Sequence, residues 1–72
     1  MAELRADMAA SVWRVLVAEG DQVTAGQNVV ILESMKMEIP VMSPVAGTVA
    51  AVPVQEGQNV DGGDVLVVVN PE

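Results

Sequence analysis

The stretch that decides the fold occurs twice. Residues 12–26 read VWRVLVAEGDQVTAG, and residues 49–63 read VAAVPVQEGQNVDGG. When the chain is shifted by 37 positions, residues 4–33 align with residues 41–70 without a gap. The shared unit is V-x-x-V-x-V-x-E-G-x-x-V-x-x-G-x-x-x-V. Two copies are too few for a solenoid, so the repeat predicts a closed pair related by a pseudo-two-fold axis.

Both copies have the pattern of β-strands. Val, Ile and Leu dominate residues 12–17, 29–32, 49–54 and 65–69, and no segment keeps a 3.6-residue period. The valines at 12, 15 and 17 break strict alternation, which predicts a bulge or bend between positions 12 and 15. Pro53 predicts an edge or bulged position in the second copy.

These patterns predict a single all-β domain over residues 1–72. Two small sheets, each mixing strands from both copies, would bury the valines of the repeat as a flattened barrel or sandwich. Trp13 is the only aromatic residue, and we expect it to cover the core; contact with a partner is the second interpretation.

The composition excludes several classes of function. The chain has no cysteine and no histidine, which excludes metal sites and catalysis based on those residues. Ten acidic residues against three basic ones argue against binding nucleic acid or an anionic membrane. No apolar run could span a bilayer and no secretory signal is visible, so we predict a cytoplasmic protein. Met1, and the fit of the repeat to both chain ends, favour a complete small protein.

The segment between the repeats, ESMKME at residues 33–38, contains Lys36, the only lysine. We predict a two-residue hairpin with Met35 and Lys36 at its tip, pairing Ser34 with Met37 and Glu33 with Glu38. Such turns need positive φ angles, which Met and Lys adopt only with strain. The symmetry mates of Lys36 fall just beyond the two termini, so Lys36 should lie at the pole opposite them.

Residues 33–37 match Glu-[Ala/Ser]-Met-Lys-Met, and Pro44, Gly47 and Val49 match Pro-x-x-Gly-x-Val. In these motifs the chain resembles the biotinyl domain of the biotin carboxyl carrier family, and in particular its short stand-alone members. The resemblance implies a flattened barrel of two four-stranded antiparallel sheets, with biotin joined to Lys36 by an amide. Some carriers insert a protruding thumb between the second and third strands. Residues 18–27 and 55–64 align without insertion, so we expect no thumb.

The resemblance also implies partners. A biotin protein ligase attaches biotin and must itself help to deprotonate the lysine. A biotin carboxylase then carboxylates the ureido nitrogen, and a carboxyltransferase passes the carboxyl group to an acceptor such as an acyl-CoA. The chain itself would be a non-catalytic carrier, monomeric on its own.

Several alternatives stay open at this point. A lipoyl domain would have a similar fold, but that family typically has Asp-Lys-Ala at the tip. An unmodified interaction module or a biotin reservoir is a third possibility. Met35 and Met37 could form an apolar platform that partners recognise, or Met37 could pack at the start of its strand. Glu33 and Glu38 could contact partners or be ordinary solvated acids.

Overall fold

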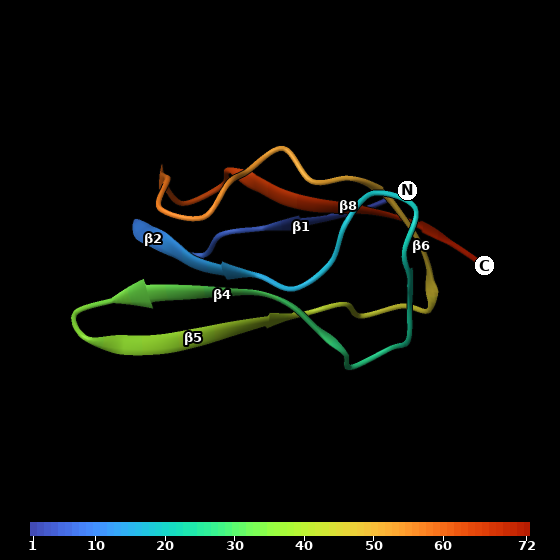
Figure 1. Cartoon of the computed structure of the whole chain (residues 1–72), viewed down its shortest axis with the longest axis horizontal. Helices are drawn as coiled ribbons and strands as arrows, with labels where there is room; N and C mark the ends of the chain where they lie inside the picture. The colour runs from blue at the N-terminus through green and yellow to red at the C-terminus, as the bar shows by residue number, and fades with distance from the viewer.

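Every regular element of the chain is a β-strand. A computed structural model describes all residues, 1–72. Its strands are β1 (Ala2–Arg5), β2 (Ala10–Val15), β3 (Gln22–Val23), β4 (Asn28–Ser34), β5 (Met37–Met42), β6 (Gly47–Ala51), β7 (Asn59–Val60) and β8 (Val65–Pro71) (Figure 1).

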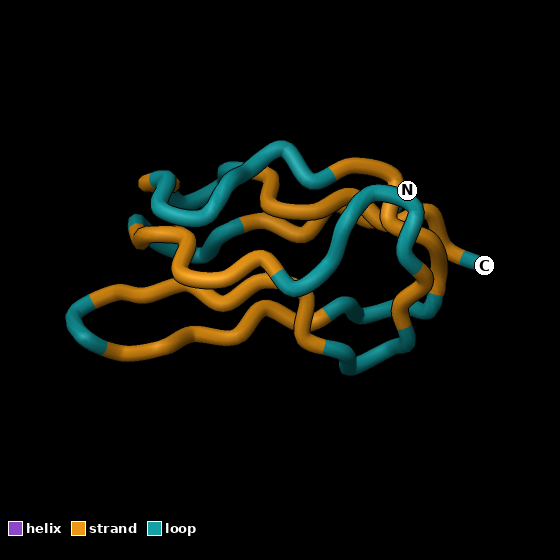
Figure 2. The backbone as a smooth tube through the Cα atoms, viewed as in Figure 1, coloured by secondary structure: helices purple, strands orange, loops and turns teal.

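The strands form two four-stranded antiparallel sheets, which confirms the predicted fold. One sheet has the order β1-β8-β6-β3 and the other β5-β4-β2-β7. A shift of 37 residues carries each strand onto its mate and one whole order onto the other, so each sheet takes two strands from each copy. Residues 16–21 join β2 to β3 with no protruding insert, and the loops in Figure 2 are short.

Bulges occur at symmetry-related places in the two sheets. The pairing of β2 with β4 skips Trp13, and the pairing of β6 with β8 skips the equivalent Ala50. This confirms the bulge predicted between positions 12 and 15. A second pair of bulges falls at Val29 and Leu66. Because the extra residue breaks the alternation, Val29 and Val30 both enter the core, as do Leu66 and Val67.

Reciprocal hydrogen bonds join the two copies. Gly20 donates its N–H to the carbonyl of Val49 at 2.8 Å, and Gly57 donates to the carbonyl of Val12 at 2.7 Å. Both glycines have left-handed backbones, with φ of 94° and 88°, which glycine adopts at little cost. The Glu-Gly turn of each copy therefore fastens the bulged strand of the other.

The core consists almost entirely of the valines and leucines of the repeat. Its buried members are Leu4, Ala6, Val12, Val17, Val23, Val29, Val30, Leu32, Val49, Val54, Val60, Leu66, Val67 and Val69. The expectation that Trp13 covers this core is wrong. Trp13 is the extra residue of the β2 bulge, and its side chain is 41% exposed on the surface.

Gly47 and Pro53 occupy their positions for different structural reasons. A Cβ added to Gly47 would overlap the carbonyl oxygen of Asn70, because β6 and β8 approach closely there. Pro53, predicted at an edge or bulged position of a strand, instead lies beyond the end of β6 at Ala51. The apolar pattern therefore extends past both β2 and β6, into loops that still bury Val17 and Val54.

The molecule is elongated, with extents of 35 × 19 × 17 Å. The β4–β5 hairpin projects from one end and both termini lie at the other, as the symmetry predicted (Figure 1). No helix long and apolar enough to cross a membrane is present.

The core predicts a contrast between two leucines. Leu66 is fully buried at a bulge, and Leu16 is 49% exposed. Leu66→Ala should lower the free energy of unfolding by about 2–5 kcal/mol, because it leaves a cavity. Leu16→Ala should change it by less than about 1 kcal/mol. Urea titration of both variants measures the difference, and equal losses would contradict this description of the core.

Candidate functional site

The β4–β5 hairpin places Lys36 at its tip, in the predicted register. Ser34 pairs with Met37, and Glu33 pairs with Glu38. Met35 and Lys36 have φ angles of 52° and 65°, the left-handed values that a two-residue turn of this kind requires. Neither side chain favours that conformation, so the turn is strained as expected. The strain persists because six residue pairs along β4 and β5 hold the two strands in register.

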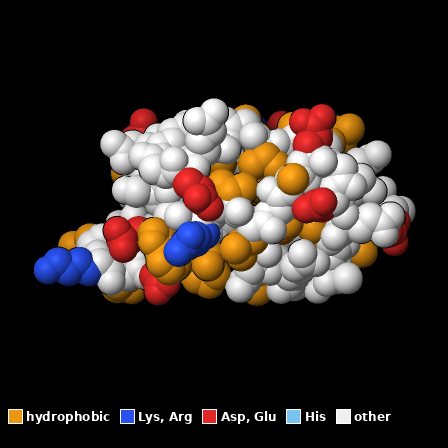
Figure 3. All heavy atoms as spheres, in the orientation of Figure 1, with side chains coloured by type: hydrophobic (Ala, Val, Ile, Leu, Met, Phe, Trp, Pro, Cys, Tyr) orange, Lys and Arg blue, Asp and Glu red, His pale blue; other side chains and the backbone are white.

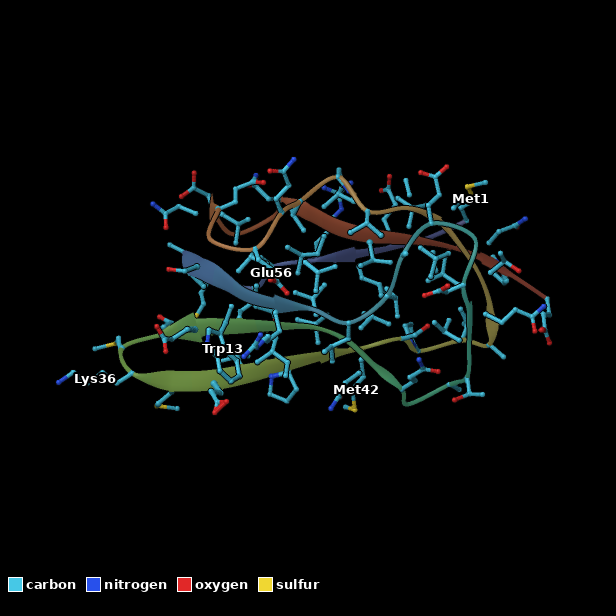
Figure 4. All side chains as sticks on the ribbon, in the orientation of Figure 1. Met1, Trp13, Lys36, Met42 and Glu56 are labelled. Carbon is cyan, nitrogen blue, oxygen red and sulfur yellow. The ribbon has the colours of Figure 1, made fainter.

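Both methionines of the motif face solvent. The exposed fraction is 92% for Met35 and 63% for Met37. The interpretation in which Met37 packs at the start of its strand is therefore wrong. Figure 4 shows the tip extending beyond the body of the molecule, with Lys36 pointing away from it. An apolar pair beside an outward-pointing amine offers a partner a contact surface that the fold itself does not use.

The amine of Lys36 has no partner in the structure. It makes no hydrogen bond, and the only ion pair in the chain joins Arg5 to Glu3. Acylation of this amine would therefore break no interaction of the folded domain. The open surroundings also leave room for a long group in any direction. The hairpin tip consequently fits the attachment of biotin through an amide bond.

Acidic side chains lie immediately behind the tip. Glu33 and Glu38 form a cross-strand pair and are both exposed, while Ser34 is half-buried. Alternation along β5 places Glu38 on the opposite face from Met37. The acids therefore border the outer face of the β2–β4–β5 sheet, and Met37 lies on the other side. The like-charge pair is mildly unfavourable for the sheet.

One exposed feature near the site is a residue that we expected to cover the core. Trp13 lies under the guanidinium of Arg14, whose carbon is 5.0 Å from the centre of the indole ring. Only the identity of the extra residue in the β2 bulge could have revealed this exposure. Separately, a crevice of about 220 Å³ lies between residues 5–8 and β5 and is also lined by Leu32. No residue of the Glu33–Met37 motif lines it.

Comparison with known proteins agrees with this geometry. The family described as "Biotin-requiring enzyme" matches residues 1–69. The chain belongs to this family. It is 51% identical over 68 residues to the biotinylated protein TB7.3 homolog of Mycobacterium leprae, covering 94% of this chain and 96% of that one. It is also 44% identical to the biotin carboxyl carrier protein of Streptococcus mutans, covering 89% of this chain and 49% of that protein.

A solved structure shows the same fold in a larger protein. A single-chain, multi-domain long-chain acyl-CoA carboxylase matches with a TM-score of 0.92 and 38% identity. The match covers 99% of this chain but only 7% of the carboxylase. The chain is thus a biotin-carrier domain of the kind found in biotin-dependent carboxylases, and its cofactor is covalently bound biotin. Such domains are non-catalytic parts of carboxylases, which points to carboxylase enzymes as partners.

The strained turn predicts that residues suited to positive φ would stabilise the fold, although they would remove the lysine. Replacing Met35 and Lys36 by Asn and Gly supplies residues that adopt positive φ readily. The double variant should be more stable than the natural chain by about 1 kcal/mol. Urea titration measures the gain, and Met35→Asn alone, which keeps the lysine, should give part of it. A double variant no more stable than the natural chain would show that the turn stores no strain.

Proposed function

We propose that Lys36 is the residue that carries biotin, and that the chain carries carboxyl groups between the biotin carboxylase and the carboxyltransferase of an acyl-CoA carboxylase. The observation that carries the proposal is the unpaired lysine at the tip of a rigid hairpin, between two exposed methionines. The likeness to a domain of an acyl-CoA carboxylase supports the choice of acceptor.

The chain's own contribution is positioning. The β4–β5 ladder fixes the Cα of Lys36, while the lysine side chain beyond it is free to turn. Tethering raises the effective concentration of the attached group at any active site within reach. Bound biotin supplies a ureido nitrogen that can take up a carboxyl group and release it. The residues that flank Lys36, Met35 and Met37, carry no group that could act as a general base, and the chain has no histidine.

The remaining parts of the proposal follow from this role. A biotin protein ligase recognises the hairpin and forms the amide with Lys36. The carrier catalyses no step of its own and acts as a monomer. The cytoplasmic location predicted from the sequence stays a prediction. Amide formation removes the positive charge of Lys36, so the net charge of −7 becomes one unit more negative.

Intact-mass measurement tests the attachment residue. After co-expression with a biotin protein ligase, the chain should gain the mass of one biotinyl group, and Lys36→Arg should gain none. Arginine keeps the positive charge but provides no acylable amine, so folding is not expected to change. A biotinylated Lys36→Arg variant, or a natural chain that gains no mass, would contradict the proposal.

A carboxylation assay tests the carrier role. The biotinylated chain, mixed with candidate carboxylase and carboxyltransferase subunits, ATP, bicarbonate and an acyl-CoA, should support formation of the carboxylated acyl-CoA. The unmodified Lys36→Arg chain should support none and serves as the control. If biotinylated chain supports no transfer with any subunit pair, the role of biotin reservoir is favoured instead.

A further inference from the structure

The outer face of the β2–β4–β5 sheet carries an apolar surface next to the hairpin. The register places Arg14, Ile31 and Pro40 in one outward row and Asn28 and Met42 in the next. Trp13, at the bulge, adds to the first row. Trp13 is 41% exposed and Met42 is 56% exposed. We name Trp13, Ile31, Pro40 and Met42 the β5-side patch. Figure 3 shows hydrophobic side chains gathered behind the tip, and Figure 4 labels Trp13, Met42 and Lys36 along this sheet.

The pseudo-symmetry of the fold provides an internal control for this surface. The equivalent positions on the other sheet hold Ala50 for Trp13, Val68 for Ile31, Glu3 for Pro40 and Arg5 for Met42. On that face Arg5 and Glu3 form an ion pair instead of an apolar surface. Because the two faces have the same backbone arrangement, the fold does not require the large apolar side chains. Their presence on the hairpin side alone points to binding.

A side-chain hydrogen bond to the backbone next to Trp13 occurs on this side alone. The carboxylate of Glu56 accepts a hydrogen bond from the N–H of Val15 at 3.0 Å, two residues beyond Trp13 (Figure 4). Its symmetry mate Glu19 makes no equivalent bond to Val52. The guanidinium of Arg14 also lies over the indole ring, so the side chain and the nearby backbone are both restrained before a partner arrives. Less ordering is then needed on binding.

Charge indicates what the partner must look like. Glu33 and Glu38 lie between the patch and Lys36, and the symmetry-related positions are Asn70 and Met1, which carry no acidic side chain. A second copy of this chain would place acidic rims against each other, which is unfavourable. The complementary surface has an apolar centre with lysine or arginine at its edge.

Distance indicates which partner it is. Trp13 lies opposite Leu32 and Ile31. The chain turns at Met35 and Lys36, three to four residues further along β4, so the tip lies about 10–13 Å away at about 3.3 Å per residue. A typical interface buries about 800 Å² on each partner, a disc about 32 Å across, so an interface that includes the hairpin reaches the patch. Before modification the amine extends no further than the lysine side chain. The enzyme that attaches biotin must therefore approach the hairpin more closely than any enzyme that meets biotin at the end of the completed arm.

We propose that the β5-side patch, with Glu33 and Glu38 at its rim, is a docking surface for the enzyme that acylates Lys36 with biotin. The inference rests on the proposed function, because it assumes that this enzyme acts on Lys36. The patch holds the domain in the orientation that presents the amine, and it takes no part in the chemistry. The patch binds the ground state and the transition state equally well, so its loss raises KM and leaves kcat unchanged.

Biotinylation kinetics with a purified biotin protein ligase test the proposal. Trp13→Ala should raise the KM for the carrier at least tenfold with little change in kcat, because buried Trp residues dominate binding at interfaces. Alanine already occupies the equivalent position 50, so the fold accepts it. Val68→Ala on the opposite sheet, at the symmetry mate of Ile31, is the control and should stay within twofold. Added salt should raise the KM of the natural chain, and less so for Glu38→Gln. A KM for Trp13→Ala within twofold of the natural value would overturn the proposal.

Two further measurements separate this proposal from its foundations. The Lys36→Arg chain should bind the ligase, without biotin or ATP, as tightly as the natural chain, and Trp13→Ala should bind more weakly. If the natural chain binds but is never biotinylated, the function assigned to Lys36 fails while the docking surface stands. Once biotinylated, Trp13→Ala should be carboxylated at the natural rate. Normal biotinylation with impaired carboxylation would assign the patch to the carboxylase and overturn the proposal.

Discussion

The fold depends on a reciprocal pair of hydrogen bonds at its centre. The Gly20 and Gly57 amides each donate to the carbonyl of the valine that precedes the bulge in the other copy. Neither copy could close its own strands, because each sheet is half made by the other. The glycines supply the left-handed turns, the bulges turn the strands, and the valines fill the space between the sheets. The repeat in the sequence therefore reflects a fold in which each copy completes the sheets of the other.

The position of the hairpin follows from the same symmetry. Two copies related by a pseudo-two-fold axis leave one connection between them, and that connection is the β4–β5 hairpin. Its symmetry-related place is occupied by the two chain ends (Figure 1). The local rules broken at the tip, with positive φ at Met35 and Lys36, are tolerated because the strands behind it are fully paired. Strain in the turn is thus concentrated at the lysine for which we propose biotin attachment.

The repeat made most of this predictable, and the failures have a physical cause. The mixed sheets, the hairpin register and the position of Lys36 at the pole opposite the termini all followed from pairing and symmetry. The position of Trp13 did not, because a bulge between residues 12 and 15 can exclude either of two residues from the ladder. Which one is excluded decides whether the indole lies inside or outside. The bulges at Val29 and Leu66 were hidden for a similar reason, since continuous apolar runs show no alternation to break. The roles of Glu33, Ser34, Met35, Lys36 and Met37 stay predictions.

The placement of both termini at the end opposite Lys36 has a consequence for larger assemblies. A polypeptide joined at either terminus begins nearly a full molecular length away from the amine, along an axis of 35 Å. A linker attached there leaves the hairpin and the neighbouring sheet face uncovered. The rigid barrel then acts as a spacer, extending the reach of any tether that holds it. The same domain can therefore serve within a large chain or by itself without any change at its working end.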